Sequence, residues 1–506
     1  MAIGGDAQFE GALLSIAPGT TFIMGADSSL EIGVDTRTTV MALGTEQRPI
    51  RFCPASSATG QWKGVRIGRD VSSDSVFEHV QIRGAGAAGA ALALQAGIRL
   101  TDVSIHGSVG DGVRAELFAR GSARLNVLNS AGAPVVLTAP AAFNELPLGG
   151  HFEGNADNVV RVRFSERITT AVTVHDPGIP YVQEGEVDVD DIEITFEAGV
   201  DYRFAADGRL VFGFSGEATE LHVAGTAEAP VVFQGAEPTK GYWQGLEIQR
   251  AVNIASTLSH MRVLHAGGLE HPSLRIASEL SVSDLTLEDN LIGLHLASPL
   301  QPDSARLTIA GTEGPPLVVL DSEALTRIPE GSSFLGNAED VIVVANDSIH
   351  CAAQGTVHAF GVPYLLTREL SLSKQARVTI EPGAQFIVGG DVSFVVGSGG
   401  DPATLIAVGT QAKPIVFRGE RDLPGYWEEI EVLTQVGDDT RIDHVEIRNA
   451  GKANSAALRL RKSISVTNTM IAHSAGAGIM RPAEAARDYS ATNTFVDVAG
   501  GDVVDP

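Results

Sequence analysis

The sequence predicts an all-β protein that folds as a right-handed parallel β-helix, a solenoid of stacked coils. Three observations predict this fold. Landmark residues recur at a long and nearly constant spacing. Short strand-like segments follow one another about every eight to twelve residues, separated by Gly, Pro, Asp and Asn. The pattern also runs through the whole chain without a linker or a break in composition.

A long unit is repeated about three times. The three tryptophans occupy one place in the pattern, in GQWKGVRI, GYWQGLEI and GYWEEIEV, and Trp62, Trp243 and Trp427 are 181 and 184 residues apart. Gly-Thr, proline, phenylalanine, histidine and Ala-Gly recur at matching offsets around them, as expected for tandem copies of one unit of about 182 residues. We expect one continuous rod, with copies at 1–170 (trimmed at its N-terminal end), 171–353 and 354–506 (incomplete at its C-terminal end).

Each copy predicts the same order of strands. It opens with a strand and a glycine turn, in LLSIAPGTTF, ITFEAGVDYRF and VTIEPGAQFIV. Apolar and polar residues alternate there, which is the period of a strand. The next strand runs to the Gly-Thr turn. A further strand begins with proline (PIRF, PVVF, PIVF), where a missing N–H is tolerated. The tryptophan strand (GVRI, GLEI, EIEV) and a strand with a glycine exit follow. EAARDY (484–489) predicts at most one helical turn.

Strands at this spacing also suit a sandwich or a barrel, but strand triplets recurring about every 20 to 25 residues favour a solenoid. One coil cannot bury its own inward face, whereas stacked coils form a continuous core. About twenty coils at ~4.8 Å each would give a rod near 100 Å long. The handedness follows the general crossover preference.

Composition excludes several classes of partner. The net charge is −26, from 62 acidic and 36 basic residues, and no basic run of five or more appears. Such a field repels nucleic acid and anionic membranes, so we expect neither as a partner. No run of 18 apolar residues predicts a transmembrane segment. Cys53 and Cys351 are far apart in an elongated stack, so we predict no intrachain disulfide.

The repeated pattern resembles the right-handed parallel β-helix regions of bacterial secreted and surface lipoproteins, over 13–86, 193–267 and 377–451. This resemblance implies an extracellular or cell-surface location. MAIGGDAQFEG lacks the basic and apolar regions of a signal peptide, so we expect the export signal to be missing from this chain. Similarity to pectate-lyase-like enzymes rests on the fold alone, and a fold does not define a function.

The recurring aromatic residues are candidates for ligand binding. An exposed platform of Trp62, Tyr242, Trp243, Tyr426 and Trp427 would stack on sugar faces. The alternative is that each tryptophan covers the core beside a turn, with its N–H bonded to a carbonyl, and we favour it. The recurring histidines, His79, His260 and His444, have no carboxylate or nucleophile beside all three, and we expect them to be turn or stacking residues.

Two groups of carboxylates are the other candidates. Glu429 and Glu431 should both face outward about 6.5–7 Å apart, a separation that glycosidase acid and base pairs use, so they are weak catalytic candidates. Glu186, Asp188 and Asp190 form a second outward row that could hold Ca²⁺, although a solvated acidic face explains them as well. No other metal or cofactor is expected.

These observations favour a non-catalytic structural or adhesive rod of a bacterial surface or secreted protein. The first alternative is a β-helix that binds or cleaves polysaccharide, and the second is a self-assembling filament or sheath subunit, since open strand edges are templates for association. The expected partners are therefore a surface polysaccharide, another protein, or further copies of the chain joined end to end.

Overall fold

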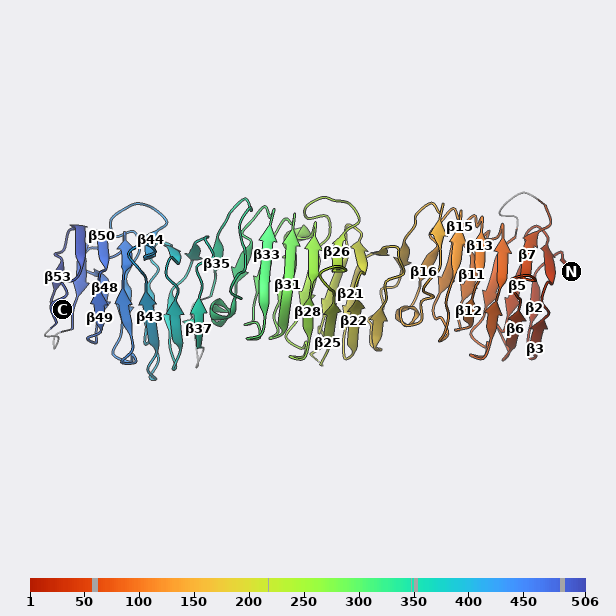
Figure 1. The fold of residues 1–506 in the computed structure, drawn as a ribbon, viewed down its shortest axis with the longest axis horizontal. Coiled ribbons are helices and arrows are strands. Elements are labelled where there is room, and N and C mark those ends of the chain that lie inside the picture. The colour runs from red at the N-terminus through yellow and green to blue at the C-terminus, as the bar shows by residue number, and fades with distance from the viewer. Residues whose placement is uncertain (57–61, 217, 347, 350–353, 483–486) are drawn as a thin grey trace. The chain divides into compact units, whose positions relative to one another are not determined.

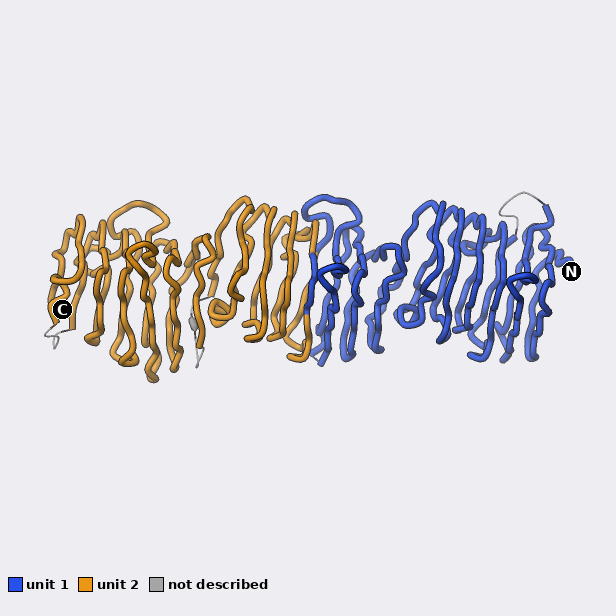
Figure 2. The backbone as a smooth tube through the Cα atoms, in the orientation of Figure 1, with its two compact units in different colours: residues 1–244, 258–262 blue, residues 245–257, 263–506 orange. Residues whose placement is uncertain are grey.

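The computed structural model describes residues 1–56, 62–216, 218–346, 348–349, 354–482 and 487–506. The chain is all-β, about 2% helical, and folds as a parallel β-solenoid of about 20 turns, which confirms the predicted fold class. Figure 1 shows its strands. The chain divides into two compact units, residues 1–244 with 258–262 and residues 245–257 with 263–506 (Figure 2). The copy boundaries and the handedness remain predictions from the sequence.

In the first unit, successive turns contribute parallel strands to three faces. The β1 sheet has the order β1 (Ala2–Ile3), β4 (Thr21–Met24), β7 (Ile50–Pro54), β10 (Val80–Arg83), β13 (Ser104–His106), β15 (Asn126–Leu128) and β17 (Phe152–Glu153). The β3 sheet joins β3 (Leu13–Ile16), β6 (Thr39–Leu43), β9 (Val76–Glu78) and β12 (Arg99–Thr101).

The β2 sheet is the longest ladder of this unit. It consists of β2 (Ala7–Phe9), β5 (Ser29–Ile32), β8 (Gly64–Ile67), β11 (Ala90–Leu94), β14 (Asp111–Ala115), β16 (Val135–Leu137), β18 (Val160–Val162), β20 (Tyr181–Gln183), β23 (Asp201–Phe204) and β26 (Val231–Gly235). Two shorter ladders pair β19 (Val172–Val174), β22 (Glu193–Glu197) and β25 (Glu220–Ala224), and β21 (Glu186–Val189) with β24 (Arg209–Phe212).

The second unit repeats this arrangement. Its β27 sheet joins β27 (Gly245–Ile248), β30 (Leu274–Ile276), β32 (Leu294–Leu296), β34 (Leu317–Val319), β35 (Ile342–Val344), β38 (Tyr364–Leu366), β41 (Gln385–Val388), β44 (Ile415–Gly419), β47 (Val445–Arg448), β50 (Met470–Ser474) and β52 (Thr494–Val498). Its β36 sheet joins β36 (Ser348–Ile349), β39 (Leu370–Leu372), β42 (Phe394–Val396), β45 (Ile430–Val432), β48 (Ala456–Leu460), β51 (Ala477–Met480) and β53 (Val503–Val504).

The β37 sheet completes the second unit with β37 (Gln354–Val357), β40 (Arg377–Ile380), β43 (Thr404–Val408), β46 (Arg441–Asp443) and β49 (Ser465–Thr467). The other strands are β28 (Thr257–Ser259), β29 (Met261–Leu264), β31 (Ser281–Glu288) and β33 (Ala305–Ala310). Helical structure in the described residues is confined to three 3₁₀ segments, η1 (Pro140–Ala142), η2 (Gly268–Glu270) and η3 (Ser322–Arg327). Residues 484–486 of EAARDY lie outside the described residues, and 487–489 are not helical.

Stacking of like side chains forms the core. Leu92 pairs with Val113 and Val113 with Val135, so these turns take 21 and 22 residues, and all three side chains are buried. Aromatic residues stack in the same way. The rings of Phe386 and Phe417 lie 4.5 Å apart and nearly parallel, one turn above the other. Each inward position therefore packs mainly against its counterpart on the next turn.

Equivalent strands of the sequence repeat lie in different sheets. In the first unit, PIRF lies in β7 of the β1 sheet, whereas PVVF lies in β26 of the β2 sheet. In the second unit, the tryptophan strands β27 and β45 belong to the β27 and β36 sheets respectively. Within each unit the repeated segment therefore moves to another face of the solenoid from one occurrence to the next.

The recurring histidines are turn residues that contact the recurring Gly-Thr pairs. His79, His260 and His444 have left-handed backbones, with φ of 48°, 45° and 50°. The carbonyl of His444 accepts a hydrogen bond from the N–H of Ile415 at 3.2 Å. A Cβ on Gly409 would lie 2.4 Å from that carbonyl oxygen. The glycine of each Gly-Thr pair is therefore required by the close approach of the next turn.

Two further expectations concern the cysteines and the membrane. Cys53 is a half-buried free thiol, and Cys351 lies outside the described residues. Within the described part of the chain, no helix has the length and apolar character needed to cross a bilayer.

Substituting Gly409 tests the close contact between turns. We expect Gly409→Ala to destabilise the fold by about 1–3 kcal/mol, because the added methyl group displaces the backbone of the adjacent turn. The measurement is the midpoint of urea unfolding followed by circular dichroism. Gly314→Ala is the control, since the nearest atom to its new Cβ would be 3.8 Å away. Equal midpoints for the two variants would contradict this account.

Candidate functional site

The tryptophans are structural residues rather than an exposed platform. Trp62, Trp243 and Trp427 are each 0% exposed. The indole N–H of Trp427 donates to the carbonyl of Arg448 at 2.8 Å, and that of Trp62 donates to the equivalent Arg83 at 2.9 Å. Stacking on a sugar requires an exposed ring face, so these three rings do not form the platform that the sequence allowed. They match the alternative, a core cover with a satisfied N–H.

Trp243 is packed by ring stacking inside the solenoid. It lies on Phe204 with 4.0 Å between the ring centroids and 1° between the ring planes. Such a contact excludes a ligand from this face of the indole.

The two tyrosines of the candidate platform are only half-buried. The hydroxyl of Tyr426 donates to Glu420 at 3.2 Å, and the guanidinium of Arg421 lies 5.9 Å from the ring centroid. Burial, followed by the charges of Glu237 and Asp207, raises the pKa of Tyr242. Both rings thus retain partial contact with solvent.

The acidic row is not uniformly outward. Glu186 is exposed and Asp188 half-buried, but Asp190 is 0% exposed, because it lies beyond the end of β21 where the alternation stops. The N–H of Ser215 donates to Asp190 Oδ1 at 2.9 Å, and Nε of Arg167 lies 3.1 Å from Asp190 Oδ2. The expectation of three outward carboxylates is therefore corrected.

The carboxylates of this row contact arginine side chains; they are not arranged as the oxygen ligands of a Ca²⁺ ion. Arg209 lies 3.1 Å from Glu186, in addition to Arg167 beside Asp190. Within the described ranges, no group of three or more His, Cys, Asp or Glu side chains has the arrangement of a metal site.

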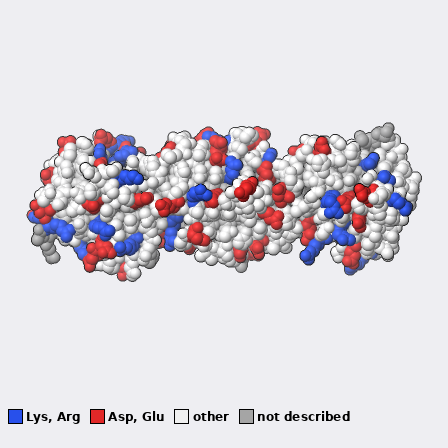
Figure 3. Space-filling view, in the orientation of Figure 1, with Lys and Arg blue, Asp and Glu red and all other residues white. Residues whose placement is uncertain are grey.

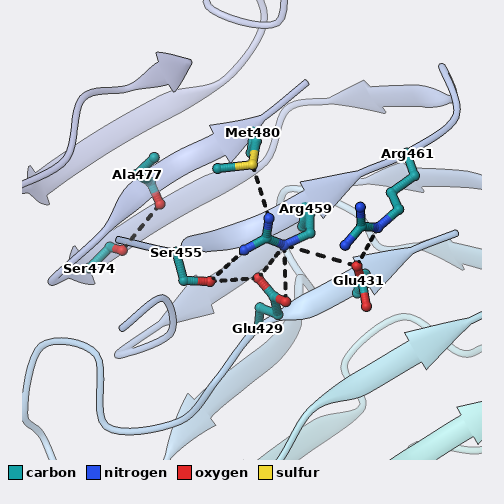
Figure 4. Close-up of polar contacts among 8 residues, drawn as sticks. All are labelled: Glu429, Glu431, Ser455, Arg459, Arg461, Ser474, Ala477 and Met480. Carbon is teal, nitrogen blue, oxygen red and sulfur yellow. Dashed lines mark hydrogen bonds and ion pairs between the residues drawn. The ribbon is translucent and has the colours of Figure 1, made fainter. Parts of the chain in front are cut away.

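The carboxylates Glu429 and Glu431 face outward as expected, but a cation separates them. Arg459, on the neighbouring β48, places Nε 2.9 Å from Glu429 and 4.0 Å from Glu431 (Figure 4). Ser455 also donates to Glu429 at 2.7 Å, and Arg461 lies 2.6 Å from Glu431. The carboxylate side chains are only 15% and 18% exposed. Each is held in an ion pair rather than poised as a general acid.

A groove lies beside these ion pairs. It has a volume of about 640 Å³ and is lined by Arg459, Arg461, Lys462, Arg481, Met480 and Thr434, among others. The basic residues come from the end of β48 and from the segment after β51. Elsewhere, basic and acidic side chains are interspersed on the face that Figure 3 shows, without a large field of one sign. This groove was not predicted. The short segment RLRK (459–462) was the available signal, but it falls below a threshold of five consecutive basic residues.

Comparison of the chain with protein-family models, with curated proteins and with solved structures found no match. The β-solenoid fold is therefore established by the structure itself, and the resemblance to lipoprotein β-helix regions rests on the sequence pattern alone.

Removing the cation between the two carboxylates should destabilise the fold. We expect Arg459→Gln to cost about 3 kcal/mol, because two poorly exposed carboxylates would lose their shared partner. Arg461→Gln is the neighbouring control, with a side chain 54% exposed, and should cost at most about 1 kcal/mol. Thermal unfolding of both variants provides the comparison. A larger loss for Arg461→Gln would contradict this assignment.

Because Asp188 is half-buried, we expect its substitution to raise the thermal stability by an amount that depends on pH. Burial, followed by repulsion from Glu186, raises the pKa of Asp188. The folded state therefore binds this proton more tightly than the unfolded state, and stability is lost as the pH rises above about 4. We expect Asp188→Asn to raise Tm at pH 7, and the gain to shrink towards zero at pH 3.5.

Asp207→Asn is the control for this titration, because Asp207 is an exposed carboxylate of the same unit. Its Tm should follow that of the parent protein at both pH values. A lower Tm for Asp188→Asn at pH 7 would show that attraction to Arg167 outweighs burial.

Proposed function

We propose that this chain is a non-catalytic structural or adhesive element of a bacterial surface or secreted protein. The observation that carries the proposal is the pairing of its outward carboxylates. Glu429 and Glu431, the sharpest catalytic candidates, are each neutralised by an arginine of the adjacent turn. Their side chains are only 15% and 18% exposed, so little of either carboxylate is left to contact a substrate.

The architecture supports the same proposal. Within each unit, the described strands pair in parallel from turn to turn, so each sheet presents a regular outward face. Such faces suit presentation and attachment. The extracellular location is part of the proposal, and it rests on the sequence resemblance to secreted and surface β-helix regions.

A polysaccharide-cleaving enzyme is the competing function, and an assay of sugar release separates the two. The protein is incubated with acidic and neutral polysaccharides, with and without Ca²⁺, and new reducing ends are quantified. We expect no release above the buffer control from any substrate. Release from one substrate that is lost in Glu429→Gln, with unfolding unchanged, would overturn the non-catalytic proposal.

A further inference from the structure

The groove beside β48 concentrates positive charge in an acidic protein. Four of its lining side chains, Arg459, Arg461, Lys462 and Arg481, are cationic, and no Asp or Glu side chain lines it in the described part of the chain. The whole sequence has 36 basic against 62 acidic residues, so this composition is the reverse of the average. Local charge of this kind attracts anions even when the net charge of the molecule repels them.

The cations of the groove differ in how firmly they are held. Arg459 is 20% exposed and fixed by Glu429 and Ser455, so it serves as the floor. Lys462 and Arg481 are 37% and 34% exposed. Lys462 lies 3.1 Å from Asp438, which is 99% exposed, and also donates to the carbonyl of Val436 at 2.7 Å. Arg481 lies 2.6 Å from Asp505, which is 70% exposed.

Exposed ion pairs of this type contribute at most about 1 kcal/mol. A ligand anion that enters the groove can therefore replace Asp438 and Asp505 as the partner of these two cations. Arg461, 54% exposed, offers a third cation at the rim.

A related surface in the first unit shows that the groove is not a general property of the repeat. The segments AALAL (90–94) and AALRL (456–460) are equivalent, and they place Ala93 where the second unit has Arg459. The hollow beside Ala93 has a volume of only about 190 Å³, and the carboxylate of Glu31 lines it. The groove beside Arg459 therefore differs from the hollow beside Ala93 in its larger volume and in having no Asp or Glu among its described lining residues.

We propose that this groove binds an acidic polysaccharide through its carboxylate or sulfate groups. Guanidinium groups bind such anions in a bidentate manner, and Arg461 and Arg481 lie on successive turns, which follow one another at about 4.8 Å. An extended chain with regularly spaced anions can engage both.

The same lining disfavours nucleic acid. It contains no aromatic residue among the described side chains, so bases have no ring on which to stack.

This inference deepens the proposed adhesive role, and binding is measured separately from cleavage. The probes are polygalacturonate and dextran sulfate, with neutral dextran as the uncharged control, titrated by calorimetry at 50 and 200 mM salt. The test variant is Lys462→Gln/Arg481→Gln. The matched control is Arg69→Gln/Arg83→Gln, which removes the same charge from exposed sites of the first unit.

We expect the parent protein and the control variant to bind at least one of the two acidic polymers, and the test variant to bind it at least 10-fold more weakly. Binding to one polymer alone identifies carboxylate or sulfate as the recognised group. No binding by the parent protein, equal losses in both variants, or equal affinity for a single-stranded oligothymidylate would overturn the proposal. Binding accompanied by new reducing ends would retain the groove but overturn the non-catalytic function.

Discussion

Parallel backbone pairing between successive turns is the constraint on which the rest of this structure depends. It places each residue beside one counterpart about 4.8 Å away, so inward positions must accept a like neighbour. Valine, leucine and phenylalanine meet this condition, as the Phe386–Phe417 stack shows. It also leaves little room where a turn bends, which explains why glycine faces the carbonyl of His444.

The same pairing determines what outward charges do. A carboxylate on one strand lies beside the residue in register on the next, and Glu431 pairs in register with Arg459. The shorter contacts are diagonal: Arg459 lies 2.9 Å from Glu429, and Arg461 lies 2.6 Å from Glu431, so both carboxylates obtain their cations from the next turn. Asp190 shows the limit of this arrangement, because the strand has ended before it and its carboxylate is buried against Arg167.

The sequence predicted the fold because each turn of a solenoid contacts only its neighbours. The repeat and the alternation within each segment are therefore enough to define it. It predicted the order of strands and the turn role of the histidines for the same reason. The sequence analysis favoured buried tryptophans, and they are buried. The groups that contact each indole, such as Phe204 and the Arg448 carbonyl, could not be read from the pattern. The groove depends on Lys462 and Arg481 coming from different turns, and their separation in sequence does not reveal that they line one hollow.

The passage of equivalent strands from one sheet to another also limits multivalent attachment. In the second unit, β27 and β45 carry the same tryptophan motif on different sheets. A ligand lying along one side of that unit therefore meets a new set of side chains instead of a second copy of the first set. Avidity requires identical sites that one ligand can reach together. The recurrence of this motif thus diversifies the surface of the unit instead of multiplying one site, while the same kind of apolar stacking fills the interior.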